Sequence, residues 1–474
     1  MPTTDHKFHL ENTYKNLPAS FYSFQSPVPV AAPKTVLYNE KLADTLGLNF
    51  QTSIAEYLSG NQLIAGAQPL AQAYAGHQFG HFTMLGDGRA ILLGEQVTPD
   101  QKRVDIQLKG AGRTPYSRQG DGRATLYSML REYLISEAMH HLGIPTTRSL
   151  AVVATGEKVF RGEHHDGAIL TRVAGSHLRV GTFEYARNVR TLEELQALID
   201  YTIDRHYPDL KNAENPTLGL LETVMDQQID LIVDWMRVGF IHGVMNTDNM
   251  SIAGETIDYG PCAFMNAYDP KTVFSSIDTQ GRYAYGNQPN IALWNIVAFA
   301  NALLPLIADD EDQSIEKAQK VIDGFKAKFS QKWTQMMFGK LGLRQVEDKD
   351  KSLVDRLLAL MEKYKADYTQ TFLALHEDRD LDTPLFQAED FKQWKEDWHR
   401  FSPDKSWMKK YNPNIIPRNH WVENALNSAV EGDMQPFNEL MERLSQPYGE
   451  HPEGVRFEVM DGGIDSGYQT FCGT

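Results

Sequence analysis

The alternation of apolar and polar positions indicates a strand-rich region between Phe79 and about residue 186. Val104, Ile106 and Leu108 alternate with polar residues, and other short apolar runs are separated by Gly-rich turns. A period of two is typical of strands that bury one face. We predict strands over Ala90–Leu93, Val104–Leu108, Ser149–Ala154, Lys158–Arg161 and Ala168–Val173, with the turn Thr155–Glu157 between the third and the fourth.

Apolar residues at helical spacing mark one segment of this region and most of the chain beyond it. Ala124–Leu142 keeps Leu126, Leu130 and Leu134 on one face, which predicts an amphipathic helix. Beyond residue 186 the strand pattern fades. We predict helices there over Leu192–His206, Pro216–Val238, Ile291–Leu304, Ile315–Phe338, Lys351–Lys363, Asp390–Phe401 and Asn419–Leu444.

The order of these elements predicts an α+β fold with two lobes. Residues 1–60 contain irregular segments and short helices at Lys41–Leu48 and Ser53–Ser59. We expect residues 1–78 to form an N-terminal extension packed on the lobes, and residues 79–185 to form a sheet-rich N-lobe. Residues 186–474 would form a mostly helical C-lobe with extra C-terminal helices and a tail.

Composition narrows the classes of protein that fit. The chain has 474 residues, 42% of them hydrophobic, so a sizeable core is expected. A net charge of −16 disfavours broad binding to nucleic acid or to anionic membranes but permits a local basic pocket. The chain has no run of eighteen apolar residues and no signal-peptide pattern at its start, so we expect a cytoplasmic protein without a membrane span. The oligomeric state stays open.

The segment His242–Pro261 carries the strongest candidate chemistry. Asp248 and Asn249 follow an apolar run in a polar turn, and Asp258 follows the short hairpin-like segment Ile252–Ile257. Mg²⁺ prefers a few protein oxygens together with nucleotide phosphates, so the amide of Asn249 and the carboxylate of Asp258 predict a metal site for phosphoryl chemistry. The alternative is that Asn and Asp stand here only as turn residues.

Other residues that could serve a phosphoryl-transfer site lie earlier in the chain, in the order that such a site needs. Gly86 and Gly88 enclose a turn whose backbone N–H groups could approach a phosphate, although an Asp-Gly turn also suits an ordinary hairpin. Lys109 ends the alternating strand, and Glu132 lies inside the following helix, where it could hold the ammonium group in place. Their alternatives are a solvated lysine and an exposed helix carboxylate.

Two arginines extend this set. Arg172 stands at a strand end and Arg179 in the loop after it. A guanidinium group suits bidentate phosphate contacts better than an ammonium group does, whereas the alternative role is surface ion pairing. Because the candidate residues come from both parts of the chain, we expect a nucleotide between the lobes.

Taken in order, these residues resemble a protein-kinase site with a glycine loop, a strand lysine, a helix glutamate, a metal asparagine and a metal Asp-x-Gly. The resemblance breaks at one position. A kinase places its catalytic Asp five residues before the metal asparagine, and here that residue is Val244. An Asp stands instead at Asp248, directly before Asn249.

This departure, the extra arginines and the motifs KGAGRTPYSRQGDGRA, NTDN and IDYGPCAFM make the chain similar to the selenoprotein O (SelO) family from about Phe79 to the C-terminus. The resemblance implies a kinase-like fold that binds ATP in reversed orientation and transfers AMP, or UMP from UTP, to hydroxyl side chains of target proteins and of itself, with release of pyrophosphate. It implies a nucleotide site at Gly86, Gly88, Arg89, Lys109, Asp121, Gly122, Arg172, Arg179 and Asp258.

The same resemblance implies that Asn249 and Asp258 hold Mg²⁺ or Mn²⁺, that Asp248 accepts the hydroxyl proton and that Glu132 orients Lys109. Two other functions compete with nucleotide transfer. A kinase would transfer the γ-phosphoryl group, which the valine at position 244 disfavours. A non-catalytic ATP-binding scaffold would have no need of the metal residues.

The two cysteines, Cys262 and Cys472, are too few for a zinc site or a disulfide framework. Cys262 follows the Asp-Tyr-Gly-Pro segment, and Cys472 stands in a Gly-rich polar tail with few groups to dock it. One interpretation is a buried thiol at Cys262 and an unstructured one at Cys472. The other is a reversible disulfide that ties the tail beside the site and acts as a redox switch.

Overall fold

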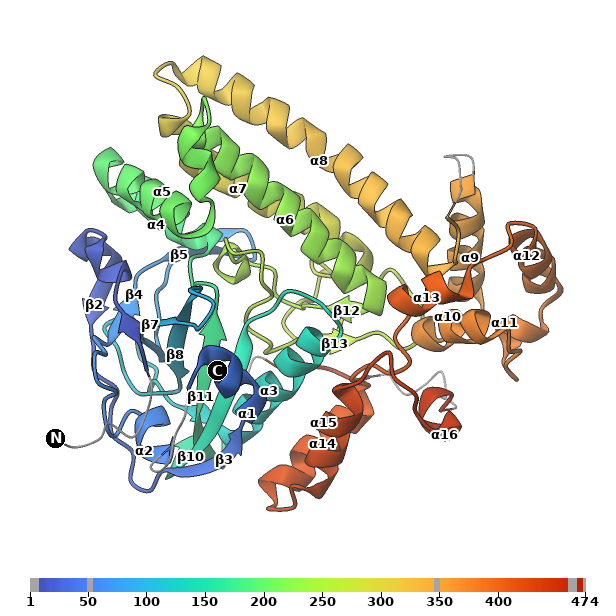
Figure 1. Ribbon diagram of the computed structural model, residues 1–474, viewed down its shortest axis with the longest axis horizontal. Coiled ribbons are helices and arrows are strands. Elements are labelled where there is room, and N and C mark those ends of the chain that lie inside the picture. The colour runs from blue at the N-terminus through green and yellow to red at the C-terminus, as the bar shows by residue number, and fades with distance from the viewer. Residues whose placement is uncertain (1–7, 49–53, 345–349, 459–466, 472–474) are drawn as a thin grey trace.

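The structure is a computed structural model that describes residues 8–48, 54–344, 350–458 and 467–471. It joins an antiparallel sheet, formed by the N-terminal third of the chain, to a helical body formed by the rest (Figure 1). The predicted α+β plan, with a sheet-rich N-terminal part and a helical C-terminal part, is confirmed. The domain boundaries at residues 78 and 185 stay a prediction.

The main sheet has the strand order β2-β4-β7-β8-β11-β10-β3, with β1 also paired to β7 and β9 to β11. Every pairing within it is antiparallel. The sheet strands are β1 Leu10–Glu11, β2 Tyr22–Phe24, β3 Lys34–Tyr38, β4 Leu70–Gln72, β7 Ala90–Val97, β8 Arg103–Lys109, β9 Ala124–Thr125, β10 Arg148–Phe160 and β11 His164–Ala174. Two small pairs lie apart from it, namely β5 Ala75–Gln78 with β6 His81–Met84, and β12 Phe240–Ile241 with β13 Ala263–Phe264.

Two strand predictions are wrong. The predicted strands Ser149–Ala154 and Lys158–Arg161 form one strand, β10, because residues 155–157 make a bulge in its pairing with β11 and not a turn. Residues 1–60, predicted to be irregular with short helices, also supply β1 to β3 to the sheet, and β4 lies between residue 60 and Phe79, where no element was predicted. These strands are two to five residues long, too short to show a period in the sequence.

The helices are α1 Glu40–Leu46, α2 Ile54–Leu58, α3 Leu126–His141, α4 Val180–Val189, α5 Leu192–His206, α6 Pro216–Val238, α7 Gln288–Leu303, α8 Glu311–Lys340, α9 Lys351–Lys363, α10 Tyr368–Glu377, α11 Pro384–Gln387, α12 Glu389–His399, α13 Lys405–Tyr411, α14 Asn419–Val430, α15 Gln435–Leu444 and α16 Glu453–Arg456. The predicted bounds of α5, α6 and α9 are confirmed residue by residue.

Other helix predictions need correction. The predicted helix Asn419–Leu444 is two helices, α14 and α15, which are separated near Gly432, a residue in the left-handed region (φ +101°). Helices α4, α10, α11, α13 and α16 were not predicted. Each has ten residues or fewer, and α4 has most of its side chains buried, so it lacks the polar face that marks an amphipathic helix.

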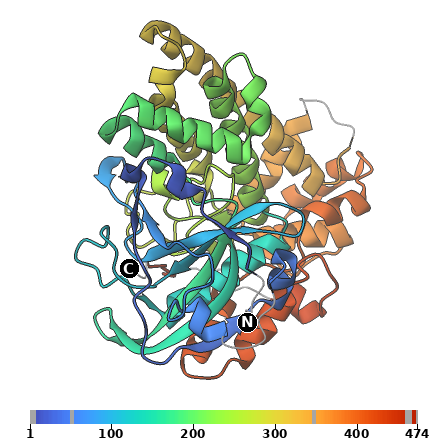
Figure 2. The same ribbon diagram turned by 60° about the vertical axis from the view of Figure 1, so that its left-hand side comes forward.

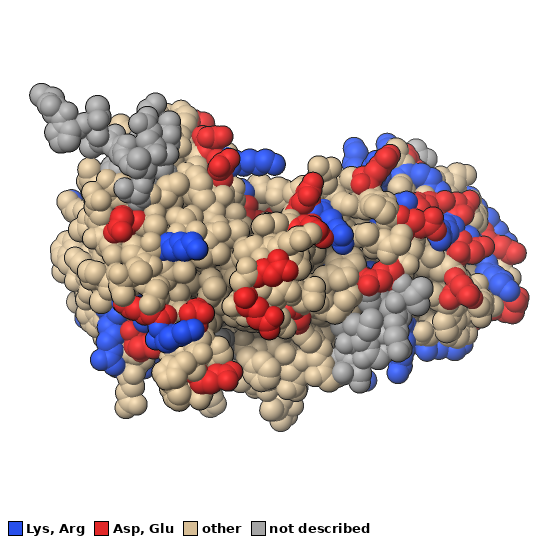
Figure 3. All heavy atoms as spheres, turned by 90° about the horizontal axis from the view of Figure 1, so that it is seen from below, with Lys and Arg blue, Asp and Glu red and all other residues tan. Residues whose placement is uncertain are grey.

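The helical body packs around α6, which contacts α7 and α8 (Figure 2). The segment Tyr285–Leu306, which includes α7, is long and apolar enough to cross a membrane, with a mean hydropathy of 1.3. In this structure α7 packs against α4, α6 and α8, as the core helix of a helical body does. On the face drawn in Figure 3, basic side chains lie among acidic ones and are densest toward the C-terminal helices.

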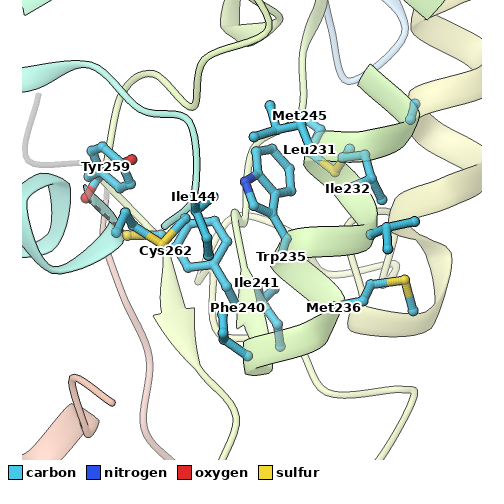
Figure 4. Packing of buried hydrophobic residues seen from close by; sticks show 14 of the residues in the cluster. Ile144, Leu231, Ile232, Trp235, Met236, Phe240, Ile241, Met245, Tyr259 and Cys262 are labelled. Atoms are coloured by element: carbon cyan, nitrogen blue, oxygen red, sulfur yellow. Dashed lines mark hydrogen bonds between the residues drawn. The ribbon is translucent and has the colours of Figure 1, made fainter. Parts of the chain in front are cut away.

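Buried aromatic packing at the end of α6 positions the segment that carries the candidate chemistry (Figure 4). Trp235 packs against Phe240 with ring centroids 5.4 Å apart, and its Nε1 donates a 2.8 Å hydrogen bond to Oγ1 of Thr256. The hairpin expected over Ile252–Ile257 is absent, because Ser251 bridges to Arg179 and Thr256 to Thr146. The residues before Asp258 are therefore held by contacts with other elements as well as by a local turn at Ser251.

Substituting Trp235 with Phe should lower the free energy of unfolding by about 1–3 kcal/mol, because it removes a buried hydrogen bond and leaves space in the core. Urea unfolding of the variant measures this loss. Trp421→Phe on α14, where the ring is only half-buried, is the matched control and should lose less. Equal losses in the two variants would contradict the role given to Trp235.

Candidate active site

Two cavities meet at the junction of the sheet and the helical body. The smaller has a volume of about 390 Å³ and the larger about 660 Å³. Five residues line both of them, namely Arg89, Lys109, Asp248, Asn249 and Asp258. The structure thus brings together the strand lysine and the three polar residues of the segment His242–Pro261, from positions up to 149 residues apart.

All nine residues predicted to hold a nucleotide line the smaller cavity: Gly86, Gly88, Arg89, Lys109, Asp121, Gly122, Arg172, Arg179 and Asp258. Its lining contains seven Arg or Lys residues and four Asp residues. A chain with a net charge of −16 therefore has a concave site where positive charge exceeds negative charge. Such a site attracts anions of high charge, such as a triphosphate.

Glu132 on α3 joins two cations of the sheet. Its Oε2 lies 2.6 Å from Lys109 Nζ at the end of β8, and its Oε1 accepts from Arg172 Nε on β11 at 2.9 Å. Lys109 also donates to Oδ1 of Asp258. Burial alone would raise the pKa of Glu132, but Arg172 and Lys109 more than offset this and lower it. The expected ion pair between Lys109 and Glu132 is present, and Arg172 forms a second ion pair with the same carboxylate.

Arg179 is held differently. It lies in the loop after β11, as predicted, and is the last residue before α4. Its Nε donates to the carbonyl of His177 at 3.2 Å and its Nη1 to the carbonyl of Asp248 at 3.3 Å, while the ring of Tyr74 lies 4.2 Å from the guanidinium carbon. Among the described residues no carboxylate forms an ion pair with Arg179, so its charge stays available to an anion.

Asp248 and Asn249 lie in the short 3₁₀ turn Thr247–Asn249. The side-chain amide of Asn249 donates to the carbonyl of Val244 at 3.1 Å, so the residue at the kinase base position orients the candidate metal ligand through its backbone. Burial raises the pKa of Asp248 to about 6, although Arg179 acts to lower it. In the described part of the chain, Oδ1 of Asp248 has no hydrogen-bond partner.

Asn249 and Asp258 fit a hard divalent cation. Both offer oxygen donors, and burial, which would raise the pKa of Asp258, is outweighed by Lys109 and Arg172, which hold it well below its usual range. In the part of the chain that the structure describes, no group of three or more His, Cys, Asp or Glu side chains could hold a metal. An ion here would complete its coordination with phosphate oxygens or water, as Mg²⁺ and Mn²⁺ do.

The glycine-rich segments fit closely against each other. A side chain at Gly86 (φ +135°) would overlap the ring of Tyr116 at 2.5 Å, and one at Gly122 (φ +72°) would meet the backbone of Gly112 at 2.1 Å. Asp121, beside Gly122, forms an ion pair with Arg161 at 2.8 Å, and this hydrogen-bonded contact lowers the pKa of Asp121 to about 2. Only glycine permits this approach of the two loops that line the cavity.

Several residues at the site were not predicted. Tyr74 and Arg161 line the smaller cavity, and Gln78 and Phe79 line the larger. Tyr74 stands 105 residues before the arginine that it contacts, so no local pattern marks it.

The described residues of the tail, 467–471, dock against the larger cavity, contrary to the expectation that the tail had few groups to hold it. Oγ1 of Thr470 donates to the carbonyl of Pro261 at 2.6 Å, and the Tyr468 hydroxyl donates to Glu423 at 2.7 Å. These contacts join segments more than forty residues apart, which is why the sequence did not indicate them.

Cys262 is fully buried beside the site, and burial raises the pKa of its thiol to about 12. Its Sγ donates to the carbonyl of Tyr259 at 3.4 Å. A thiol in this setting is a packing group with little thiolate character. Cys472 lies outside the described residues, so the disulfide between the two stays a prediction.

Comparisons with known proteins agree with this geometry. The sequence model of a family described as "Protein adenylyltransferase SelO" matches residues 5–445. A protein of Brevibacillus brevis named "Protein nucleotidyltransferase YdiU" is 54% identical, with 100% of this chain and 99% of that protein covered. A protein of the same name from Halalkalibacterium halodurans is 56% identical, with 98% of this chain and 97% of that protein covered.

Among solved structures, ROP2 from Toxoplasma gondii, described as a virulence factor with a protein-kinase fold and no enzymatic activity, is 12% identical. The alignment covers 69% of this chain and 86% of that chain with a TM-score of 0.24, a likeness too low to carry an argument.

Substituting Glu132 with Gln should lower the free energy of unfolding by about 3–5 kcal/mol, because Lys109 and Arg172 would lose the buried anion between them. Thermal unfolding measures the loss, and Mg·ATP should restore part of it because phosphates can replace the missing charge. The control is Asp166→Asn, which breaks an exposed ion pair with Lys158 and should cost about 0–1 kcal/mol. A Glu132 variant as stable as the wild type would contradict the central role of this carboxylate.

Proposed function

The chain belongs to the SelO family and is a protein nucleotidyltransferase, and from this premise we propose that it transfers AMP from ATP to Ser, Thr and Tyr hydroxyls of target proteins. Nucleotide transfer to protein requires a nucleotide substrate and protein targets. The specific proposal adds that ATP is the donor, that UTP can replace it for UMP transfer, and that the chain also modifies itself.

One observation carries this proposal, namely that three buried cations converge on the smaller cavity. Lys109, Arg172 and Arg179 are each at most 6% exposed. If they enclose the β- and γ-phosphates, the γ-phosphorus is shielded from attack and the α-phosphorus is the one that faces an acceptor. Pyrophosphate then leaves into a site whose charge already matches its own.

We assign the proton acceptor to Asp248. The acceptor hydroxyl oxygen forms a bond to the α-phosphorus, the bond from that phosphorus to the bridging oxygen breaks, and pyrophosphate departs. The hydroxyl proton goes to Asp248, whose raised pKa of about 6 makes it a stronger base than an exposed carboxylate while leaving it ionised at neutral pH. Arg179, bonded to the carbonyl of the same residue, links this base to the phosphate site.

The remaining residues bind and orient. Glu132 holds Lys109 and Arg172 in the positions from which they contact the phosphates. The rest of the nucleotide is enclosed by the loops that contain Gly86, Gly88, Arg89, Asp121 and Gly122. Asn249 and Asp258 would hold Mg²⁺ or Mn²⁺. When bound, the ion supplies neutralisation of phosphate charge.

Two alternatives are weaker. A γ-phosphoryl-transferring kinase would need a base at Val244, whose side chain has none, and would need the γ-phosphorus exposed. A non-catalytic ATP-binding scaffold would have no use for an ionised Asp258 beside Asn249, nor for a carboxylate of raised pKa at Asp248.

ATP carrying label in the α-phosphate should label protein, including the enzyme itself, whereas ATP labelled in the γ-phosphate should not. Only the α-phosphorus remains on the acceptor when pyrophosphate is the leaving group. Label on protein is counted after denaturing electrophoresis, with EDTA as the metal-free control. Attachment of γ-label alone would replace this proposal with the kinase alternative.

Variants of the two aspartates should differ in what they lose. Asp248→Asn should keep the affinity for Mg·ATP and lower transfer by roughly 10²–10⁴-fold, the usual contribution of a general base. Asp258→Asn should lose both metal-dependent nucleotide affinity and transfer. Calorimetric titration with Mg·ATP and rates of α-label transfer separate the two. If Asp248→Asn lost binding and transfer equally, the carboxylate would be a nucleotide ligand and not the base.

A further inference from the structure

We propose that the tip of the β5–β6 hairpin, residues Gln78 and Phe79, forms the acceptor side of the active site, with the Phe79 ring contacting the hydroxyl-bearing side chain of the target protein. This inference rests on the proposed function and adds a substrate-contacting residue to it. Neither residue belongs to the nucleotide or metal sets described above.

The distribution of residues between the two cavities supports this role. Six of the nine nucleotide residues line only the smaller cavity, whereas Gln78 and Phe79 line only the larger. Asp248 lies at the boundary and lines both. An acceptor oxygen must attack the α-phosphorus from the side opposite the leaving pyrophosphate. If the phosphates fill the smaller cavity, the acceptor side chain must enter through the larger.

The backbone of Phe79 occupies a conformation that suits other residues better. Gln78 pairs with His81, so Phe79 and Gly80 form a two-residue hairpin loop, and both have positive φ (+52° and +87°). This kind of loop favours Asn-Gly, since Asn tolerates the left-handed region and a bulky side chain does so poorly. A phenylalanine kept in a strained position indicates a function for its ring.

The hairpin is hydrogen-bonded to the two residues that precede Asp248. The Phe79 N–H donates to Oδ1 of Asn246 at 3.1 Å, and the His77 N–H donates to Oγ1 of Thr247 at 2.7 Å. The Phe79 ring meets the edge of Tyr283 at a centroid distance of 5.4 Å, and the Tyr283 hydroxyl bonds the same Asn246 oxygen. The ring is thereby fixed in position relative to the proposed base.

Gly76 brings the strand itself into contact with Asp248. A side chain at Gly76 would lie 2.5 Å from Oδ1 of Asp248, so β5 covers one oxygen of that carboxylate. The Gln78 side chain lies close enough to Asp248 to act to lower its pKa, although burial dominates and raises it. The acceptor side of the base is therefore bounded by Gln78 and Phe79, a polar amide beside an aromatic ring.

The alternation of side chains along the hairpin provides a control. His77 and Phe82 stand opposite each other and their rings lie 5.5 Å apart, on the face turned away from Gln78. Phe82 is 41% exposed and does not line the larger cavity. Phe79 and Phe82 are thus two phenylalanines in one hairpin, of which only the first faces the proposed acceptor path.

Gln78 and Phe79 together can contact the side chain of one residue in an extended segment of a target protein. An aromatic ring packs against the carbon atoms of Ser, Thr or Tyr, and the amide of Gln78 can bond a hydroxyl or a peptide group. A cavity of about 660 Å³ can hold such a side chain and its backbone. Phe79 would raise the affinity for the acceptor without contacting ATP.

The test compares Phe79→Asn, Phe79→Tyr and Phe82→Asn in the full-length chain, with dephosphorylated casein as acceptor and α-labelled ATP as donor. We expect Phe79→Asn to raise the KM for casein at least tenfold, with a Kd for Mg·ATP within twofold of wild type and a Tm within about 4 °C of it, because the fit of Asn to the loop offsets the lost contact with Tyr283. Phe79→Tyr should restore the wild-type KM to within about threefold. Phe82→Asn should leave KM and kcat unchanged.

Each other outcome overturns the inference. A wild-type KM for Phe79→Asn would show that the ring does not contact the acceptor. A loss of Mg·ATP affinity or a larger fall in Tm in that variant would make Phe79 a nucleotide-side or structural residue. An equal rise in KM for Phe82→Asn would make the effect one of the whole hairpin. A wild-type chain that binds Mg·ATP but transfers no α-label would instead refute the proposed function, and the acceptor role with it.

Discussion

The shared contact of Glu132 with Lys109 and Arg172 is the constraint on which the rest of the site depends. It ties α3 to two neighbouring strands, and through Lys109 it reaches Asp258 in the helical half. Lys109, Arg172 and Glu132 are buried and Asp258 lies partly exposed beside them, so the buried charges are kept only because their partners are present. Removing one of them leaves a charge without compensation, and this links the stability of the junction to the geometry of the cavity.

Arg179 is held in place by contacts of a different kind. Backbone carbonyls and the ring of Tyr74 hold it, and these contacts fix its position without neutralising its charge. A chain that is acidic overall thereby keeps one buried cation available for an anion. Lys109 and Arg172 are held in place by carboxylates, whereas Arg179 supplies the excess charge. The ion pairs of Lys109 and Arg172 therefore keep the cavity ordered, and the charge of Arg179 attracts phosphate to it.

The segment with Asp248 and Asn249 is placed by contacts from several directions. The hairpin β5–β6 fastens Asn246 and Thr247, the carbonyl of Val244 orients Asn249, and Trp235 on α6 fixes Thr256 before Asp258. Short irregular segments of this kind have little stability of their own. Their precision comes from the sheet and the helices packed around them, so residues far from the chemistry in sequence set the geometry of the site.

The sequence by itself determined the features that depend on local periodicity or on the order of motifs. The bounds of α5, α6 and α9 follow from amphipathic spacing within each helix, and the pairing of Lys109 with Glu132 follows from a strand lysine and a helix glutamate in one motif order. Only the tertiary structure decided that β10 is one bulged strand, that α14 and α15 are separate, and that Tyr74 and Phe79 belong to the site. The physical reason is that a bulge, a helix break or a contact across a hundred residues is stabilised by partners remote in the chain, and those partners leave no local pattern.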